Sequence, residues 1–162
     1  MELNRSAYSV LQKWKSSNNR KPLLIRGARQ VGKTTLVRQF AKEFDYYLEL
    51  NLEREKEKSL FEIDDVNSIL NAAYLLKGKT VGKGSILLFI DEIQESPKAI
   101  ALLRYFFEER SDIYIIAAGS LLEFALRSVA NFPVGRISYL YLSPFNFEEY
   151  LLAINLSLIH IS

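Results

Sequence analysis

Residues 27–34 read Gly-Ala-Arg-Gln-Val-Gly-Lys-Thr, the most informative stretch of this sequence. It satisfies every fixed position of the pattern G-x-x-x-x-G-K-[ST]. Such a loop curls so that successive backbone N–H groups point inward, and Gly27 and Gly32 permit backbone angles that side chains would forbid. Lys33 would place a positive charge between two phosphates, and the Thr34 hydroxyl would coordinate magnesium. The pattern therefore predicts a loop that holds the phosphates of a nucleotide.

The sequence around the loop agrees with that prediction. An apolar run at residues 23–25 predicts a short buried strand, and residues 35–44 carry apolar side chains at helical spacing. The start of that helix adds its dipole to the attraction for phosphate. A chance glycine-lysine turn would not need a strand before it and a helix after it. The expected nucleotide-binding residues are Gly27, Ala28, Arg29, Gln30, Val31, Gly32, Lys33, Thr34 and Thr35.

A second motif lies at residues 86–92, where five apolar residues run directly into Asp91 and Glu92. A continuous apolar run is typical of a parallel strand that is buried on both faces. Asp91 would hold Mg²⁺ through its water shell, and Glu92 would orient and deprotonate an attacking water. Alone, the pair is equally well a solvated acidic turn. Beside the phosphate loop, it favours ATP hydrolysis, with Lys33 and Glu92 as catalytic residues.

Two further residues are candidates for catalysis. Ser120 follows an apolar run and would contact the γ-phosphate or the attacking water, although a serine there is equally well a helix cap. Arg136 precedes the last apolar run and would approach a γ-phosphate of its own or a neighbouring subunit. The alternative for Arg136 is an ordinary surface arginine.

The remaining pattern is an alternation of strands and helices, which predicts an α/β fold with a mostly parallel sheet and helices on both faces. Residues 53–65 are rich in charge and favour a solvated helical face. We expect further strands at 46–52, 113–118 and 137–142. We expect helices at 5–15, 66–76, 97–110, 121–127 and 147–153.

Composition excludes several classes of protein. Hydrophobic residues make up 49% of the 162, which suffices for one ordinary core. The absence of cysteine excludes disulfides and thiolate metal sites, and the N-terminus lacks the pattern of a signal peptide. No apolar stretch is long enough to span a bilayer. We therefore expect a cytoplasmic protein, and a formal net charge of +2 gives little support to a nucleic-acid partner.

The C-terminal residues 156–162 read Leu-Ser-Leu-Ile-His-Ile-Ser, which resembles the translation of a transposon-derived sequencing adapter. We interpret them as a non-native tail and residues 1–155 as one ATPase domain that is truncated at its C-terminus. The alternative is a genuine short strand. Because the single histidine, His160, lies in this tail, the rest of the chain offers no histidine for catalysis or metal binding.

The chain resembles the prokaryotic AAA-type ATP-binding proteins that carry a restriction-endonuclease-like C-terminal domain of unknown function. The matching stretches are residues 25–42, 86–94, 117–124 and 134–151 (IRGARQVGKTTLVRQFAK, ILLFIDEIQ, AAGSLLEF and VGRISYLYLSPFNFEEYL). The resemblance implies a P-loop NTPase fold of the additional-strand, AAA-like type, in which one inserted strand separates the strands that precede Gly27 and Asp91. It implies roles for Lys33, Thr34, Asp91, Glu92, Ser120 and Arg136. Members of that family are much longer.

Three functions compete. The first is an ATPase that binds ATP with Mg²⁺ and drives or gates an attached module. The second is a P-loop kinase or other phosphotransferase, which would need an acceptor pocket and an arginine-bearing lid. The third is a nucleotide switch that does not hydrolyse. We favour the first because Glu92 fits water better than an acceptor, and we expect a homo-oligomer or a partner protein.

Overall fold

The computed structural model describes residues 5–27, 32–80, 82–120 and 135–142. The helices expected at 121–127 and 147–153, the proposed tail at 156–162 and the loop residues Ala28, Arg29, Gln30 and Val31 lie outside the described residues.

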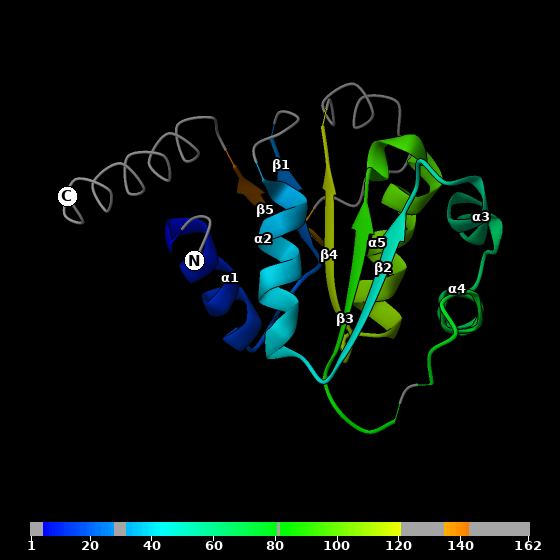
Figure 1. Ribbon diagram of the computed structural model, residues 1–162, viewed down its shortest axis with the longest axis horizontal. Helices are drawn as coiled ribbons and strands as arrows, with labels where there is room; N and C mark the ends of the chain where they lie inside the picture. Colours follow the sequence, from blue (N-terminus) through cyan, green and yellow to red (C-terminus); the bar gives the residue numbers. More distant parts are fainter. Residues whose placement is uncertain (1–4, 28–31, 81, 121–134, 143–162) are drawn as a thin grey trace, which may run out of the picture.

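A parallel sheet forms the centre of the domain, and the arrows of its strands all point the same way in Figure 1. In the described parts of the chain it has five strands: β1 (Leu23–Arg26), β2 (Tyr46–Asn51), β3 (Ile86–Asp91), β4 (Tyr114–Gly119) and β5 (Ser138–Tyr141). Their order is β2-β3-β4-β1-β5, and every neighbouring pair is parallel. Because β4 lies between β3 and β1, the predicted inserted strand is confirmed.

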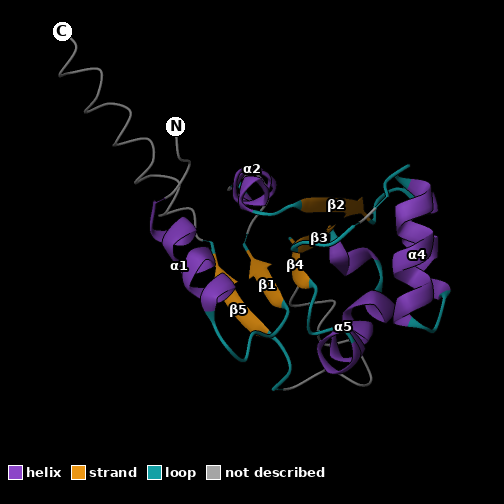
Figure 2. Cartoon of the chain, turned by 90° about the horizontal axis from the view of Figure 1, so that it is seen from below, coloured by secondary structure: helices purple, strands orange, loops and turns teal. Residues whose placement is uncertain are grey.

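Helices cover both faces of this sheet, as predicted, and Figure 2 shows α2 and α5 on opposite sides of it. The helices are α1 (Arg5–Ser16), α2 (Lys33–Phe40), α3 (Glu55–Lys58), α4 (Val66–Leu76) and α5 (Pro97–Glu109). Short 3-10 turns are η1 (Ala41–Glu43), η2 (Ser59–Glu62) and η3 (Ile93–Glu95).

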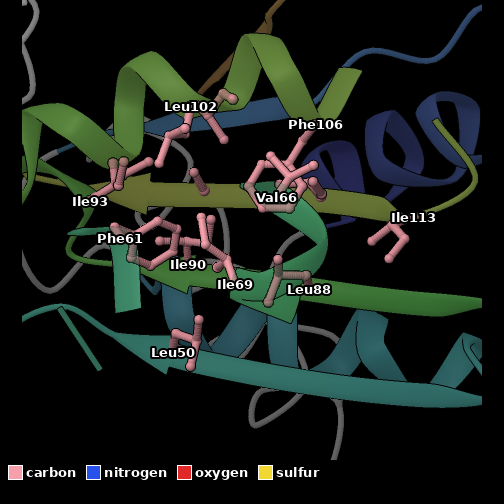
Figure 3. Packing of buried hydrophobic residues seen from close by; sticks show 14 of the residues in the cluster. Leu50, Phe61, Val66, Ile69, Leu88, Ile90, Ile93, Leu102, Phe106 and Ile113 are labelled. Atoms are coloured by element: carbon pink, nitrogen blue, oxygen red, sulfur yellow. The ribbon is translucent and has the colours of Figure 1, made fainter. Parts of the chain in front are cut away.

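Among the described residues, two apolar clusters hold the layers together because the side chains of each strand alternate between the faces. One cluster joins the sheet to η2, α4 and α5, and Figure 3 shows Phe61, Ile69 and Phe106 packed over Leu88 and Ile90. The other cluster joins α1 and α2 to the opposite face. All six residues of β3 are buried, as the apolar run predicted.

The start of α5 matches its sequence signal. Ser96 lies before the helix in extended backbone, and its Oγ accepts a hydrogen bond from the Ala99 N–H at 3.0 Å. Pro97 occupies the first turn, where its missing N–H and fixed backbone angle cost nothing. This cap orients α5 as the chain leaves the end of β3.

The expectation for residues 53–65 was wrong in part. Most of its charged residues are exposed, but Glu57 is only 4% exposed and Phe61 is fully buried, so one side of the segment packs against the rest of the domain. Glu57 is compensated by Lys77, whose Nζ lies 2.6 Å from its Oε1, and by the N–H of Asn51. A charged side chain is tolerated in a buried position when it is paired in this way.

Within the ranges that the structure describes, no helix combines the length and the apolar character needed to cross a membrane.

Candidate nucleotide-binding site

The candidate residues gather at the carboxyl edge of the sheet. Gly27 follows β1, Asp91 ends β3, and Ser120 follows β4, which lies between the other two. Since parallel strands end at the same edge, three separate sequence motifs meet there. This is where open α/β sheets bind ligands.

Lys33 joins the two ends of the phosphate loop. It is 7% exposed, and its Nζ donates a hydrogen bond to the carbonyl of Gly27 at 2.8 Å. Gly32, which precedes α2, has φ 85°, a left-handed conformation that favours glycine over any residue with a Cβ. α2 therefore begins at Lys33, two residues before the helix expected from the sequence, with Thr35 exposed in its first turn.

Thr34 and Asp91, the two predicted magnesium ligands, are in direct contact. Thr34 Oγ1 donates to Asp91 Oδ2 at 2.8 Å, although the two residues are 57 positions apart in the chain. Burial raises the pKa of the Asp91 carboxyl above its usual range, against the opposing hydrogen bond from Thr34. A hydroxyl and a carboxylate are the oxygen donors that Mg²⁺ prefers, so these residues fit the ion.

Mg²⁺ would need further ligands from outside the protein. Among the described residues, no group of three or more His, Cys, Asp or Glu side chains could hold a metal ion. Mg²⁺ usually keeps several waters and takes one or two protein ligands together with substrate phosphates. Thr34 and Asp91 match that kind of site.

Glu92 leaves the strand in an unusual conformation. With φ 55° and ψ 46°, it is the one non-glycine residue at positive φ in the described parts of the chain. Its N–H donates to Asp91 Oδ1 at 2.9 Å, which fixes the turn after β3. Left-handed backbone costs about 1–2 kcal/mol for a residue with a Cβ. The two neighbouring carboxylates have different partners: Asp91 accepts a hydrogen bond from Thr34, and Glu92 accepts one from Gln94.

Ser120 lies at the end of the strand between the two motifs. It is 2% exposed, and its Oγ has no hydrogen-bond partner among the described residues. A buried hydroxyl without a partner is unfavourable, so its position is consistent with a contact to a ligand. The alternative role of Ser120, as a cap of the helix expected at 121–127, involves residues outside the described ranges.

Arg136 lies away from this edge, so the expected approach to a γ-phosphate of its own chain is not what the structure shows. Its approach to a γ-phosphate of a neighbouring subunit stays a prediction. Its Nε is 2.9 Å from Glu108 Oε1 near the end of α5. Arg136 precedes β5, whose first residue, Ser138, bonds through its N–H to the carbonyl of Pro22 before β1. Because β5 and β1 are parallel, residues that precede them lie at the amino edge, opposite Lys33.

A model of a family described as an AAA domain matches residues 19–151. The chain belongs to this AAA family. Its P-loop fold also occurs in two solved structures. A Walker-type ATPase of Pyrococcus abyssi matches with a TM-score of 0.58 and 20% identity, over 93% of this chain and 57% of that one.

The second structure is the Orc1 protein of Aeropyrum pernix in complex with DNA, with a TM-score of 0.51 and 15% identity over 85% of this chain and 43% of that one. At these identities the likeness concerns the fold. This AAA domain thus spans less than two thirds of either protein. Among curated proteins, no sequence matches significantly.

Sequence reasoning missed two features beside the site of this AAA domain. The first is Gln94, which belongs to the motif at residues 86–94 but received no predicted role. Its Nε2 donates a hydrogen bond to Glu92 Oε2 at 2.6 Å. Glu49 on β2 accepts two hydrogen bonds from Arg38 of α2, at 2.9 and 2.7 Å, and one from the Tyr47 hydroxyl at 2.6 Å. The Arg38 hydrogen bonds lower the pKa of Glu49.

This second network ties the helix of the phosphate loop to the strand beside β3. The period-two pattern of β2 was the available signal, because it places Tyr47 and Glu49 on the same face of the strand. Their partner Arg38 comes from another element, and the sequence did not indicate that pairing.

Proposed function

We propose that this AAA domain binds ATP with Mg²⁺ and hydrolyses it to ADP and phosphate. The observation that carries the proposal is the partly buried hydrogen bond of 2.8 Å from Thr34 Oγ1 to Asp91 Oδ2, beside the lysine of the phosphate loop. This contact brings the two motifs of a P-loop site together at one edge of the sheet. The membership in the AAA family supports it.

Each residue has a distinct role in this proposal. Lys33 exchanges its bond with the Gly27 carbonyl for phosphate oxygens, and the backbone N–H groups of the loop bind the same phosphates. Thr34 and Asp91 would hold Mg²⁺, which neutralises phosphate charge when bound. Ser120 offers its unpaired hydroxyl to the γ-phosphate or to the water.

Glu92 acts as the general base in the proposed reaction. A water oxygen attacks the γ-phosphorus and passes its proton to the Glu92 carboxylate. The bond between the γ-phosphorus and the bridging oxygen breaks, and ADP leaves with that oxygen. A general base contributes about 10²–10⁴-fold to the rate. We further propose that the cycle drives or gates a module beyond this domain, a role suggested by the longer proteins that it resembles.

Phosphate release from the Glu92→Gln variant tests this function. The substitution keeps size and polarity and removes the base, so MgATP binding should persist while the rate falls by about 10²–10⁴-fold. Release is measured with protein in excess over ATP and without any other acceptor. Glu95→Gln, at an exposed residue three positions later, is the matched control and should keep the parental rate.

Two results would contradict the proposal. No phosphate release by the parent chain under these conditions would favour a nucleotide switch or a phosphotransferase. A parental rate in Glu92→Gln would remove Glu92 as the base.

A further inference from the structure

Gln94 holds the side chain of Glu92 through one short hydrogen bond. Gln94 Nε2 donates to Glu92 Oε2 at 2.6 Å, within the turn that leaves β3. The carboxylate oxygen of Glu92 accepts this hydrogen bond, so the amide presents its nitrogen to Glu92 and its oxygen away from it. The orientation of the amide is thereby fixed by Glu92.

The other end of the same amide has no partner. Gln94 Oε1 is buried without a hydrogen bond among the described residues. A buried carbonyl oxygen without a partner is destabilising, and an apolar side chain of the same length would avoid that cost. Gln94 is therefore poorly explained as a residue that serves folding alone.

The hydrogen bond from Gln94 restricts the side chain of a residue in an unusual turn. The left-handed conformation of Glu92 turns the chain sharply, and η3 then packs against β4, the strand that ends in Ser120. A glutamate side chain has three rotatable bonds, and fixing them costs conformational entropy. A hydrogen bond from Gln94 within the same turn restricts the carboxylate before the substrate binds.

We propose that Gln94 is a positioning residue, which orients the Glu92 carboxylate for proton abstraction from the attacking water. This inference rests on the proposed function, since it requires Glu92 to be the base. Gln94 acts through Glu92 alone and does not take part in binding ATP or Mg²⁺. Its loss should therefore change turnover and leave binding intact.

The variant Gln94→Met tests the proposal, because methionine keeps the length of the side chain and lacks the amide. We expect kcat to fall by about ten- to a hundredfold, the range for loss of a hydrogen bond to a charged group. KM and the dissociation constant for MgATP should stay within about twofold of the parental values, because the substitution removes no contact with the bound substrate. Gln12→Met is the matched control, since Gln12 also donates to a glutamate, Glu43, on the surface, and it should change neither constant.

A double-mutant cycle separates positioning from a structural role. If Gln94 acts only through Glu92, then adding Gln94→Met to Glu92→Gln should cause no further loss of rate. Equal losses in both backgrounds would overturn the inference, as would a parental kcat in Gln94→Met while Glu92→Gln is slow. A fast Glu92→Gln variant, or a parent without turnover, would instead overturn the proposed function and the inference with it.

Discussion

At the scale of single residues, Glu92 shows a conflict between stability and the proposed chemistry. Its backbone adopts the left-handed region at φ 55°, which glycine enters freely and other residues enter at a cost. Backbone strain of this kind persists where the surrounding structure enforces it. Here the hydrogen bonds from its own N–H to Asp91 and from Gln94 to its carboxylate hold the turn.

This strain predicts that glycine at position 92 gives a more stable protein than alanine, the reverse of the usual order. Both Glu92→Ala and Glu92→Gly remove the carboxylate, but only glycine also relieves the backbone. We expect the glycine variant to unfold with a free energy about 1 kcal/mol higher than the alanine variant. Urea unfolding followed by circular dichroism measures the difference.

Glu95 provides the control because it lies in the same segment and is exposed, and its φ is not positive. There the usual order should hold, with Glu95→Ala more stable than Glu95→Gly by about 0.5–1 kcal/mol. The same order at both positions would show that the conformation of Glu92 is not strained.

The sequence predicted the placement of Lys33, Thr34 and Asp91 because short motifs with fixed spacing specify them. It did not predict the contact between Gln94 and Glu92, which depends on the left-handed turn that no motif position requires. It did not decide among the alternatives for Arg136, because only the position of β5 beside β1 shows that the residue before β5 lies at the edge of the sheet opposite the phosphate loop.

At the scale of elements, the sequence predicted the positions of strands wherever the apolar pattern was strong. All five described strands lie within a residue or two of the expected positions. The exceptions are the start of α2, which follows the geometry of the phosphate loop, and residues 53–65, whose charges concealed the buried Phe61. A run of charged residues in the sequence does not show which of them is buried and paired with an opposite charge in the fold.

The cap of α5 gives a prediction at this scale. Ser96→Ala removes the oxygen that accepts from the Ala99 N–H and leaves a buried donor unsatisfied. We expect a loss of about 1 kcal/mol in the free energy of unfolding. Ser96→Asp, which restores an acceptor, should recover most of it, and chemical denaturation measures both variants. Equal losses in the two variants would mean that packing around Ser96, not capping, sets its contribution.

At the scale of the whole molecule, the nucleotide should stabilise the domain because its site joins β1, β3, β4 and α2. A ligand that binds only the folded state adds about 2.7 kcal/mol at a hundred times its dissociation constant. For a chain of this size, that corresponds to a rise of about 5–10 °C in Tm. A MgATP analogue that resists hydrolysis should produce this shift in the parent protein.

Lys33→Ala should remove that shift at the same ligand concentration, since Lys33 is the main phosphate contact in the proposal. Lys98→Ala is the control because Lys98 is a lysine on the surface, paired with Asp64 at 2.9 Å. It should keep the full shift. Equal shifts in all three proteins would reject Lys33 as a phosphate ligand.

The burial of β3 also predicts the order in which the parts of the domain open. β3 is covered on both faces and has β2 and β4 as neighbours, so its amides reach solvent only when much of the sheet separates. β5, at an edge of the described sheet and half covered, can detach at a much lower cost. Asp91 and Glu92 are thus anchored to the part of the domain that opens last. Partial unfolding that starts at β5 can proceed some way before it separates these two carboxylates.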